Sequence, residues 1–168
     1  ELYRFSTIAM QWEQLDAPEV SGSPPSPLSL YGSGHSMTTL GSDLYLLTFE
    51  DSLSSEFLRF STTALQWEHL DAPDLFNDDY GGDYKCWMAV VGSDLYVFGA
   101  YPSLIRFSMT ALQWEDLSHQ RENSLSSPPS PRTYIGMTAV GSDLFVFGGD
   151  TGDSSYYEGD DSSYYLKG

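Results

Sequence analysis

The sequence contains a single cysteine, few basic residues and no long hydrophobic run. One cysteine cannot form an intrachain disulfide, and the CxxC pairs of thiolate metal sites are absent, which is compatible with a reducing compartment. No apolar segment approaches the ~20 residues that a membrane-spanning helix requires, so we expect no direct membrane insertion. The compartment itself, cytoplasm or organelle, stays open.

Positive charge is also scarce. Seven lysines and arginines stand against 24 acidic residues, which gives a net charge of −17. A surface of this sign repels phosphate, so nucleic acid is excluded as a partner. Basic proteins and cations remain compatible with it.

Helical periodicity and the common catalytic motifs are lacking as well. The sequence has no phosphate-binding glycine loop, no dinucleotide fingerprint and no Gly-x-Ser-x-Gly. His35, His69 and His119 fall at different positions of the repeat described below, so we predict no histidine metal site. We therefore expect a protein that is not an enzyme and needs no cofactor.

What the sequence does contain is repetition with a period near fifty residues. Gln-Trp-Glu occurs three times at spacings of 55 and 47 residues, centred on Trp12, Trp67 and Trp114. Gly-Ser-Asp occurs three times at spacings of 51 and 49 residues. An Arg-Phe-Ser phrase precedes each tryptophan. Three phrases in a fixed order indicate one structural unit written several times.

Within one unit the pattern predicts a four-stranded antiparallel meander. In the middle unit, tight turns separate four β-rich runs at Lys85–Val91, Leu95–Ala100, Leu104–Ser108 and Ala111–Leu117. Cys86 falls in the first run, and we expect it to be a small core residue. Such a sheet is apolar on both faces, so neighbouring sheets must stack to bury them.

The repeat also predicts the organisation of the chain. Residues 1–15 should supply the last two strands of a preceding unit. Residues 16–70 and 71–117 should each hold a linker and a complete unit, and 118–168 a linker and a partial third. That third unit should include a strand within Ser162–Gly168. Both ends then fall inside units, which predicts completion by another chain or by a missing segment.

These motifs resemble the kelch repeat. The closest match is "SPRTYIGMTAVGSDLFVFGGD", Ser130–Asp150, which keeps the glycine pair Gly148 and Gly149. The first unit has Thr48 and Phe49 at that place. The resemblance implies an all-β fold, a partial β-propeller of kelch-type four-stranded antiparallel blades, and a role in protein interaction.

Residues that recur in every unit are expected to be structural. Each Trp should pack between neighbouring sheets. Each Arg should pair with the Glu of the adjacent strand, since a catalytic role would need a unique site. The arginines are Arg4, Arg59 and Arg106, and the glutamates are Glu13, Glu68 and Glu115.

Residues that no other unit copies are the candidates for binding. Two connections combine acidic with aromatic side chains, and a rigid sheet that presents varied loops is a common binding surface. The predicted protein-binding residues are Leu75, Phe76, Asp78, Asp79, Tyr80, Tyr156, Tyr157, Asp160 and Asp161. The alternatives are a solvated surface or a Ca²⁺ site, although neither segment has EF-hand spacing.

These observations predict a non-catalytic scaffold for protein–protein interaction, part of a larger protein or assembly. We expect its partner to be a protein, and the acidic charge favours a basic one. We expect this partner to dock on the variable edge, the side of the sheets from which the differing connections leave. One alternative is a metal-dependent enzyme at a propeller axis. The other is a peripheral structural subunit of an organellar or photosynthetic complex.

Overall fold

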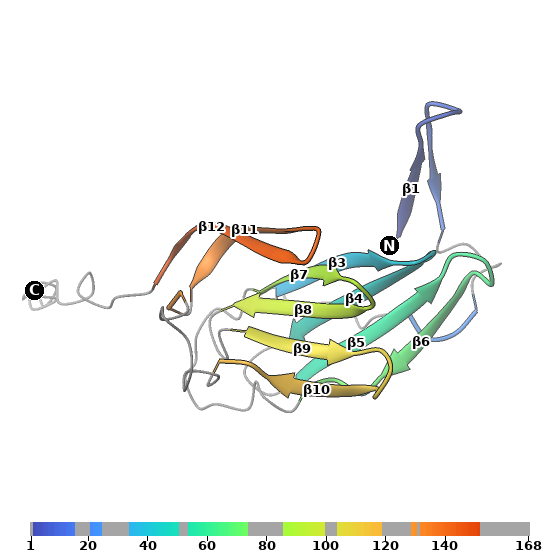
Figure 1. Ribbon diagram of the computed structural model, residues 1–168. Coiled ribbons are helices and arrows are strands. Elements are labelled where there is room, and N and C mark those ends of the chain that lie inside the picture. Colours follow the sequence, from blue (N-terminus) through green and yellow to red (C-terminus); the bar gives the residue numbers. More distant parts are fainter. Residues whose placement is uncertain are drawn as a thin grey trace, which may run out of the picture.

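The computed structural model describes residues 2–15, 21–24, 34–50, 54–73, 86–99, 104–118, 129–130 and 132–151. Strands β1 to β12 make up the regular secondary structure of these ranges, and no helix occurs in them (Figure 1). Consequently, none of their elements could cross a membrane as a helix. The all-β class predicted from the sequence is confirmed.

The first complete sheet, sheet 1, is an antiparallel meander of four consecutive strands. Its strands are β3 (Gly34–Leu40), β4 (Asp43–Glu50), β5 (Ser54–Ser61) and β6 (Gln66–Leu70). The turn between β3 and β4 contains Gly41 at φ +64°, a conformation that glycine adopts without steric cost.

The second complete sheet, sheet 2, has the same order. It comprises β7 (Cys86–Val91), β8 (Asp94–Gly99), β9 (Leu104–Ser108) and β10 (Gln113–Asp116). Strand β10 is shorter than predicted, because the turn before it extends to Leu112, at φ +52°.

Two separate hairpins complete the described structure. The N-terminal hairpin pairs β1 (Tyr3–Ser6) with β2 (Gln11–Gln14). The C-terminal hairpin pairs β11 (Thr133–Val140) with β12 (Asp143–Asp150). The strand predicted within 162–168 lies outside the described residues.

The serine of each Arg-Phe-Ser phrase builds the turn that follows it. Its hydroxyl accepts a hydrogen bond from the backbone N–H three residues later, as in other serine-stabilised turns. The N–H of Ala9 donates to the Ser6 hydroxyl, that of Ala64 to Ser61, and that of Ala111 to Ser108. The repeat of this phrase therefore reflects one turn made three times.

The main core lies between sheet 1 and sheet 2. Phe57 from sheet 1 and Phe107 from sheet 2 are both almost fully buried, with ring centroids 5.0 Å apart at 70°. Leu47, Leu95 and Ile105 belong to the same cluster and are 0% exposed. Cys86 also belongs to it, as predicted, and burial raises the pKa of its thiol well above the ordinary value.

A second, smaller core covers the other face of sheet 1. It contains Leu58, Phe60 and Trp67, against which Leu2 and Leu15 pack from either end of the N-terminal hairpin. The hairpin thus rests on sheet 1 through its base, while its strands project away from the stack (Figure 1).

The first strands of successive units lie side by side. Strand β7 contacts β3 of sheet 1 and β11 of the C-terminal hairpin (Figure 1). In addition, Met88 N–H donates to the Ser36 hydroxyl at 2.8 Å, from β7 to β3. None of the described sheets closes on itself, so the kelch-type propeller stays a prediction.

Two isoleucines offer a matched test of the core. Ile105 is 0% exposed between the two sheets, whereas Ile8 is 97% exposed in the turn after β1. We expect Ile105→Ala to lower the free energy of unfolding by about 2–5 kcal/mol, and Ile8→Ala to change it by less than about 0.5 kcal/mol. Urea titrations of both variants measure the difference; equal costs would contradict the placement of the core.

Candidate functional site

The described residues carry three candidates for a site: a repeated cluster of charges, the repeated aromatic residues, and one cavity. The charge cluster is clearest in sheet 1. Arg59 Nε and Nη2 donate to Asp43 Oδ2 at 2.8 and 2.6 Å, and Nη1 donates to Glu68 Oε2 at 3.3 Å. The Asp43 side chain is 13% exposed. The hydrogen bond to Asp43 raises the pKa of Arg59, so the guanidinium stays charged.

Sheet 2 contains the same cluster with looser geometry. Arg106 pairs with Glu115 on the adjacent strand, and its Nη1 lies 3.7 Å from Asp94 Oδ2. The Tyr96 hydroxyl, which contributes most, and the Glu115 carboxylate raise the pKa of this arginine. In the N-terminal hairpin, Arg4 pairs with Glu13.

The predicted arginine–glutamate pairs are therefore confirmed in all three units. The structure adds the aspartate of Gly-Ser-Asp, which sequence reasoning treated only as part of a turn. The signal was present, because Asp43 and Asp94 recur in step with Arg59 and Arg106. A cluster that recurs in this way joins the second, third and fourth strands of a complete sheet.

The three tryptophans stack on the phenylalanine of the neighbouring strand but differ in burial. Trp67 is 5% exposed against Phe60, at 4.8 Å between ring centroids. Trp114 contacts both Phe107 and Phe57 at 5.0 Å, so it does lie between neighbouring sheets as predicted. Its Nε1–H donates to the Asp71 carbonyl at 2.9 Å, across to the chain that follows sheet 1.

Trp12 departs from this pattern. It stacks on Phe5 at 5.0 Å but is 70% exposed, because no described sheet covers that face of the N-terminal hairpin. The predicted wedge between sheets is therefore absent at this position of the described structure.

Gly148 and Gly149 are structural as well. Both have positive φ, at +77° and +93°. A Cβ on Gly149 would lie 2.8 Å from the Thr133 carbonyl oxygen and 2.5 Å from an Ile135 methyl carbon. Only glycine therefore lets the two strands of the hairpin approach this closely at position 149. Arg132 then donates from Nη1 to the Gly148 carbonyl at 3.0 Å.

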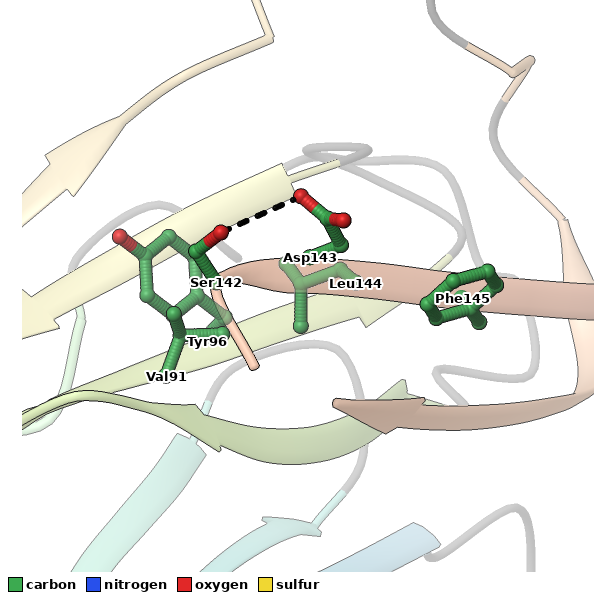
Figure 2. A pocket seen from close by; sticks show the side chains of 6 residues that line it. All are labelled: Val91, Tyr96, Ser142, Asp143, Leu144 and Phe145. Carbon is green, nitrogen blue, oxygen red and sulfur yellow. Dashed lines mark hydrogen bonds between the residues drawn. The ribbon is translucent and has the colours of Figure 1, made fainter. Parts of the chain in front are cut away.

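A cavity of about 480 Å³ lies between sheet 2 and the C-terminal hairpin and opens to solvent (Figure 2). Val91 and Tyr96 line it from sheet 2, and Ser142, Asp143, Leu144 and Phe145 line it from the hairpin. The Ser142 hydroxyl donates to Asp143 Oδ1 at 3.5 Å. The lining has neither a histidine nor a cysteine.

The predicted protein-binding residues, 75, 76, 78–80, 156, 157, 160 and 161, all lie outside the described residues. In the ranges that are described, no cluster of three His, Cys, Asp or Glu side chains could hold a metal ion. His69 Nε2 lies 3.2 Å from the Ser23 carbonyl oxygen, and His35 is exposed on β3.

The strand order shows where the variable connections leave the sheets. The turns that repeat, such as those at Gly41 and Gly92, join strands at one edge of each sheet, where edge means the side formed by the ends of the strands. Because the strands are antiparallel, the chain leaves β4, β6, β8, β10 and β12 at the opposite edge. That edge is therefore common to every connection whose sequence differs between units.

No protein-family profile matches the chain, and no curated protein matches it significantly. The resemblance to kelch repeats therefore rests on the residues themselves.

Two carboxylates on the same arginine test the charge cluster. Asp43→Asn removes a partly buried charged acceptor of two hydrogen bonds, and we expect it to lower the free energy of unfolding by about 1–2 kcal/mol. Glu68→Gln removes an exposed partner of Arg59 and should cost at most about 0.5 kcal/mol. Denaturant unfolding of both variants measures the two losses in free energy of unfolding. A larger loss for Glu68→Gln would contradict the view that Asp43 is the main partner of Arg59.

Proposed function

We propose that the chain is a segment of a kelch-type β-propeller that acts as a non-catalytic scaffold for protein–protein interaction. The packing of sheets 1 and 2 supports the propeller arrangement, since propeller blades are four-stranded antiparallel sheets packed around an axis. The neighbouring first strands β3, β7 and β11 would lie next to that axis.

One observation carries the binding role. The repeated turns share one edge of the sheets, and every connection that differs between units leaves from the other. A rigid set of strands can thus hold unlike segments next to one another on a single edge. This separation between a uniform scaffold and a varied edge is typical of binding proteins.

The composition of these segments indicates the kind of partner. The net charge of −17 attracts basic surfaces from a distance. The segment that follows sheet 1 contains Leu75, Phe76 and Tyr80 together with Asp78 and Asp79. Aromatic and aliphatic side chains supply contact area, and the acidic ones supply selectivity for basic residues. The proposed partner is a basic protein segment that carries apolar residues.

Two variants of equal charge test this proposal. Asp78→Asn with Asp79→Asn and Glu13→Gln with Glu68→Gln each raise the net charge from −17 to −15. Binding to an array of peptides with alternating lysine and leucine is measured by fluorescence anisotropy at low and physiological salt. We expect the aspartate variant to weaken binding several-fold more than the glutamate variant.

A further variant separates contact from charge. Phe76→Ala with Tyr80→Ala leaves the net charge unchanged and should also weaken peptide binding. Equal losses in the two charge variants, with no loss in the aromatic variant, would reduce the interaction to non-specific attraction and would refute a binding site in this segment.

A further inference from the structure

An exposed serine lies beside a guanidinium just before β11. Ser130 precedes Arg132 by two residues and is exposed to solvent. Arg132 Nη2 donates to Ser130 Oγ at 3.3 Å, and its Nε donates to the Ser130 carbonyl oxygen at 3.2 Å. The serine is therefore accessible from solvent, and its hydroxyl contacts a positive charge.

The structure holds Arg132 from both ends. Its backbone N–H donates to the Gly99 carbonyl oxygen at 3.2 Å, at the end of β8. Its Nη1 donates to the Gly148 carbonyl oxygen at 3.0 Å, on β12. Because these bonds already restrict the side chain, a ligand that binds the guanidinium costs it little further conformational entropy.

The contacts of Arg132 differ from those of the other described arginines. The others pair with carboxylates; they are Arg4, Arg59 and Arg106. Among the described residues, the hydrogen bonds of Arg132 go to uncharged oxygens, on Ser130 and Gly148. These bonds use one of the two N–H groups on each terminal nitrogen, and the second N–H groups can donate to an anion.

A phosphate on the Ser130 hydroxyl suits this guanidinium. A phosphoserine carries about −1.5 to −2 charges at pH 7 and has three acceptor oxygens. Its hydrogen bonds to arginine are charge-assisted, and they are about twice as strong as a neutral contact such as the one that Ser130 Oγ makes. The phosphate also carries more charge than a carboxylate, so it competes well with an acidic side chain for Arg132.

The residue after Ser130 indicates which kinases could act on it. Pro131 follows Ser130, and its backbone has no N–H. Proline-directed protein kinases select serines with this neighbour. Ser130 lies outside the strands, and Pro129 before it is also exposed, so a kinase can reach the hydroxyl without breaking a strand pair.

The chain contains a matched serine that lacks the arginine. The phrase Ser-Pro-Pro-Ser-Pro occurs twice, at 23–27 and 127–131. In the first copy Ser26 has the place of the phosphate acceptor, and Leu28 stands where the second copy has Arg132. Ser26 and Leu28 lie outside the described residues, so this correspondence rests on the sequence.

We propose that Ser130 is a phosphorylation site whose phosphate is bound by Arg132. A protein kinase transfers the γ-phosphoryl group of ATP to Ser130 Oγ. The new O–P bond replaces the bond between the γ-phosphorus and the β,γ-bridging oxygen, ADP leaves, and the hydroxyl proton passes to the general base of the kinase. The phosphate then joins the segment before β11 to β12 through Arg132 and the Gly148 carbonyl. This modification goes beyond the proposed binding role.

Phosphate transfer tests the site itself. The triple variant Ser23→Ala, Ser26→Ala and Ser127→Ala leaves Ser130 as the only serine followed by proline. It is incubated with magnesium, ATP and a proline-directed kinase that modifies the synthetic peptide 124–134. Mass spectrometry of the folded chain should then find a phosphate on Ser130. An unmodified Ser130 in the chain, beside a modified peptide, would overturn the proposal.

The ionisation of the phosphate tests the role of Arg132. A nearby positive charge favours the dianion, so it lowers the second pKa of the phosphate, which is ordinarily about 6. By phosphorus NMR titration, this pKa should be about 0.2–0.7 of a unit lower for phosphorylated Ser130 than for phosphorylated Ser26. The second protein is prepared from the variant Ser23→Ala, Ser127→Ala and Ser130→Ala. Equal pKa values would refute binding by Arg132.

Two arginine variants of equal charge separate contact from net charge. Arg132→Gln and Arg4→Gln each change the net charge of the chain from −17 to −18. Arg132→Gln should raise the second pKa of the phosphate on Ser130 by the amount given above. Arg4→Gln should leave it unchanged, because the N-terminal hairpin rests on sheet 1. Asp150, at the end of β12, acts against the shift, but it is present in both variants.

The outcomes can be told apart. The comparison of the two phosphoserines needs no change at Arg132, so it decides the matter even if Arg132→Gln destabilises the fold. Equal shifts in Arg132→Gln and Arg4→Gln would reduce the effect to net charge and refute the contact. None of these results depends on whether basic peptides bind, so the phosphorylation site and the proposed scaffold role can fail separately.

Discussion

The contact of Phe57 with Phe107 and Trp114 holds the two complete sheets together, with both ring pairs at 5.0 Å. A single four-stranded sheet of this composition is apolar on both faces and would expose them to water. Stacking one sheet on the next removes this surface at about 25 cal/mol per Å². Each complete sheet therefore depends on its neighbour to keep this apolar surface out of water.

The ion clusters have a different role from the core. Arg59 lies opposite Tyr45 and Glu68, and it bonds Asp43 at the start of β4. Charges at a partly exposed edge contribute little net stability, but they pair correctly in only one register. The hydrophobic contacts therefore stabilise the stack, while the clusters specify how strands align.

Local pairing could be predicted from the sequence, but exposure could not. Strands joined by short turns pair with each other, so repeated phrases predicted the hairpins and the partner of Arg59. Trp12 and Trp67 share one phrase yet are 70% and 5% exposed, because burial depends on which sheet lies opposite. The cavity beside Tyr96 was missed for the same reason, since its lining joins sheet 2 to the C-terminal hairpin, two elements that are distant in the sequence. The aspartate contact of the arginines was missed because the strands that carry it are not joined at that point.

A double-mutant cycle on Phe57 and Trp114 tests the stacking of the sheets most directly. The two residues lie on different sheets, at β5 and β10, so only the proposed packing brings their rings together. Unfolding free energies of Phe57→Leu, Trp114→Leu and the double variant give the coupling energy. The account predicts a coupling of about 0.5–1.5 kcal/mol, as for other aromatic pairs in contact. Additive effects, within about 0.3 kcal/mol, would contradict it.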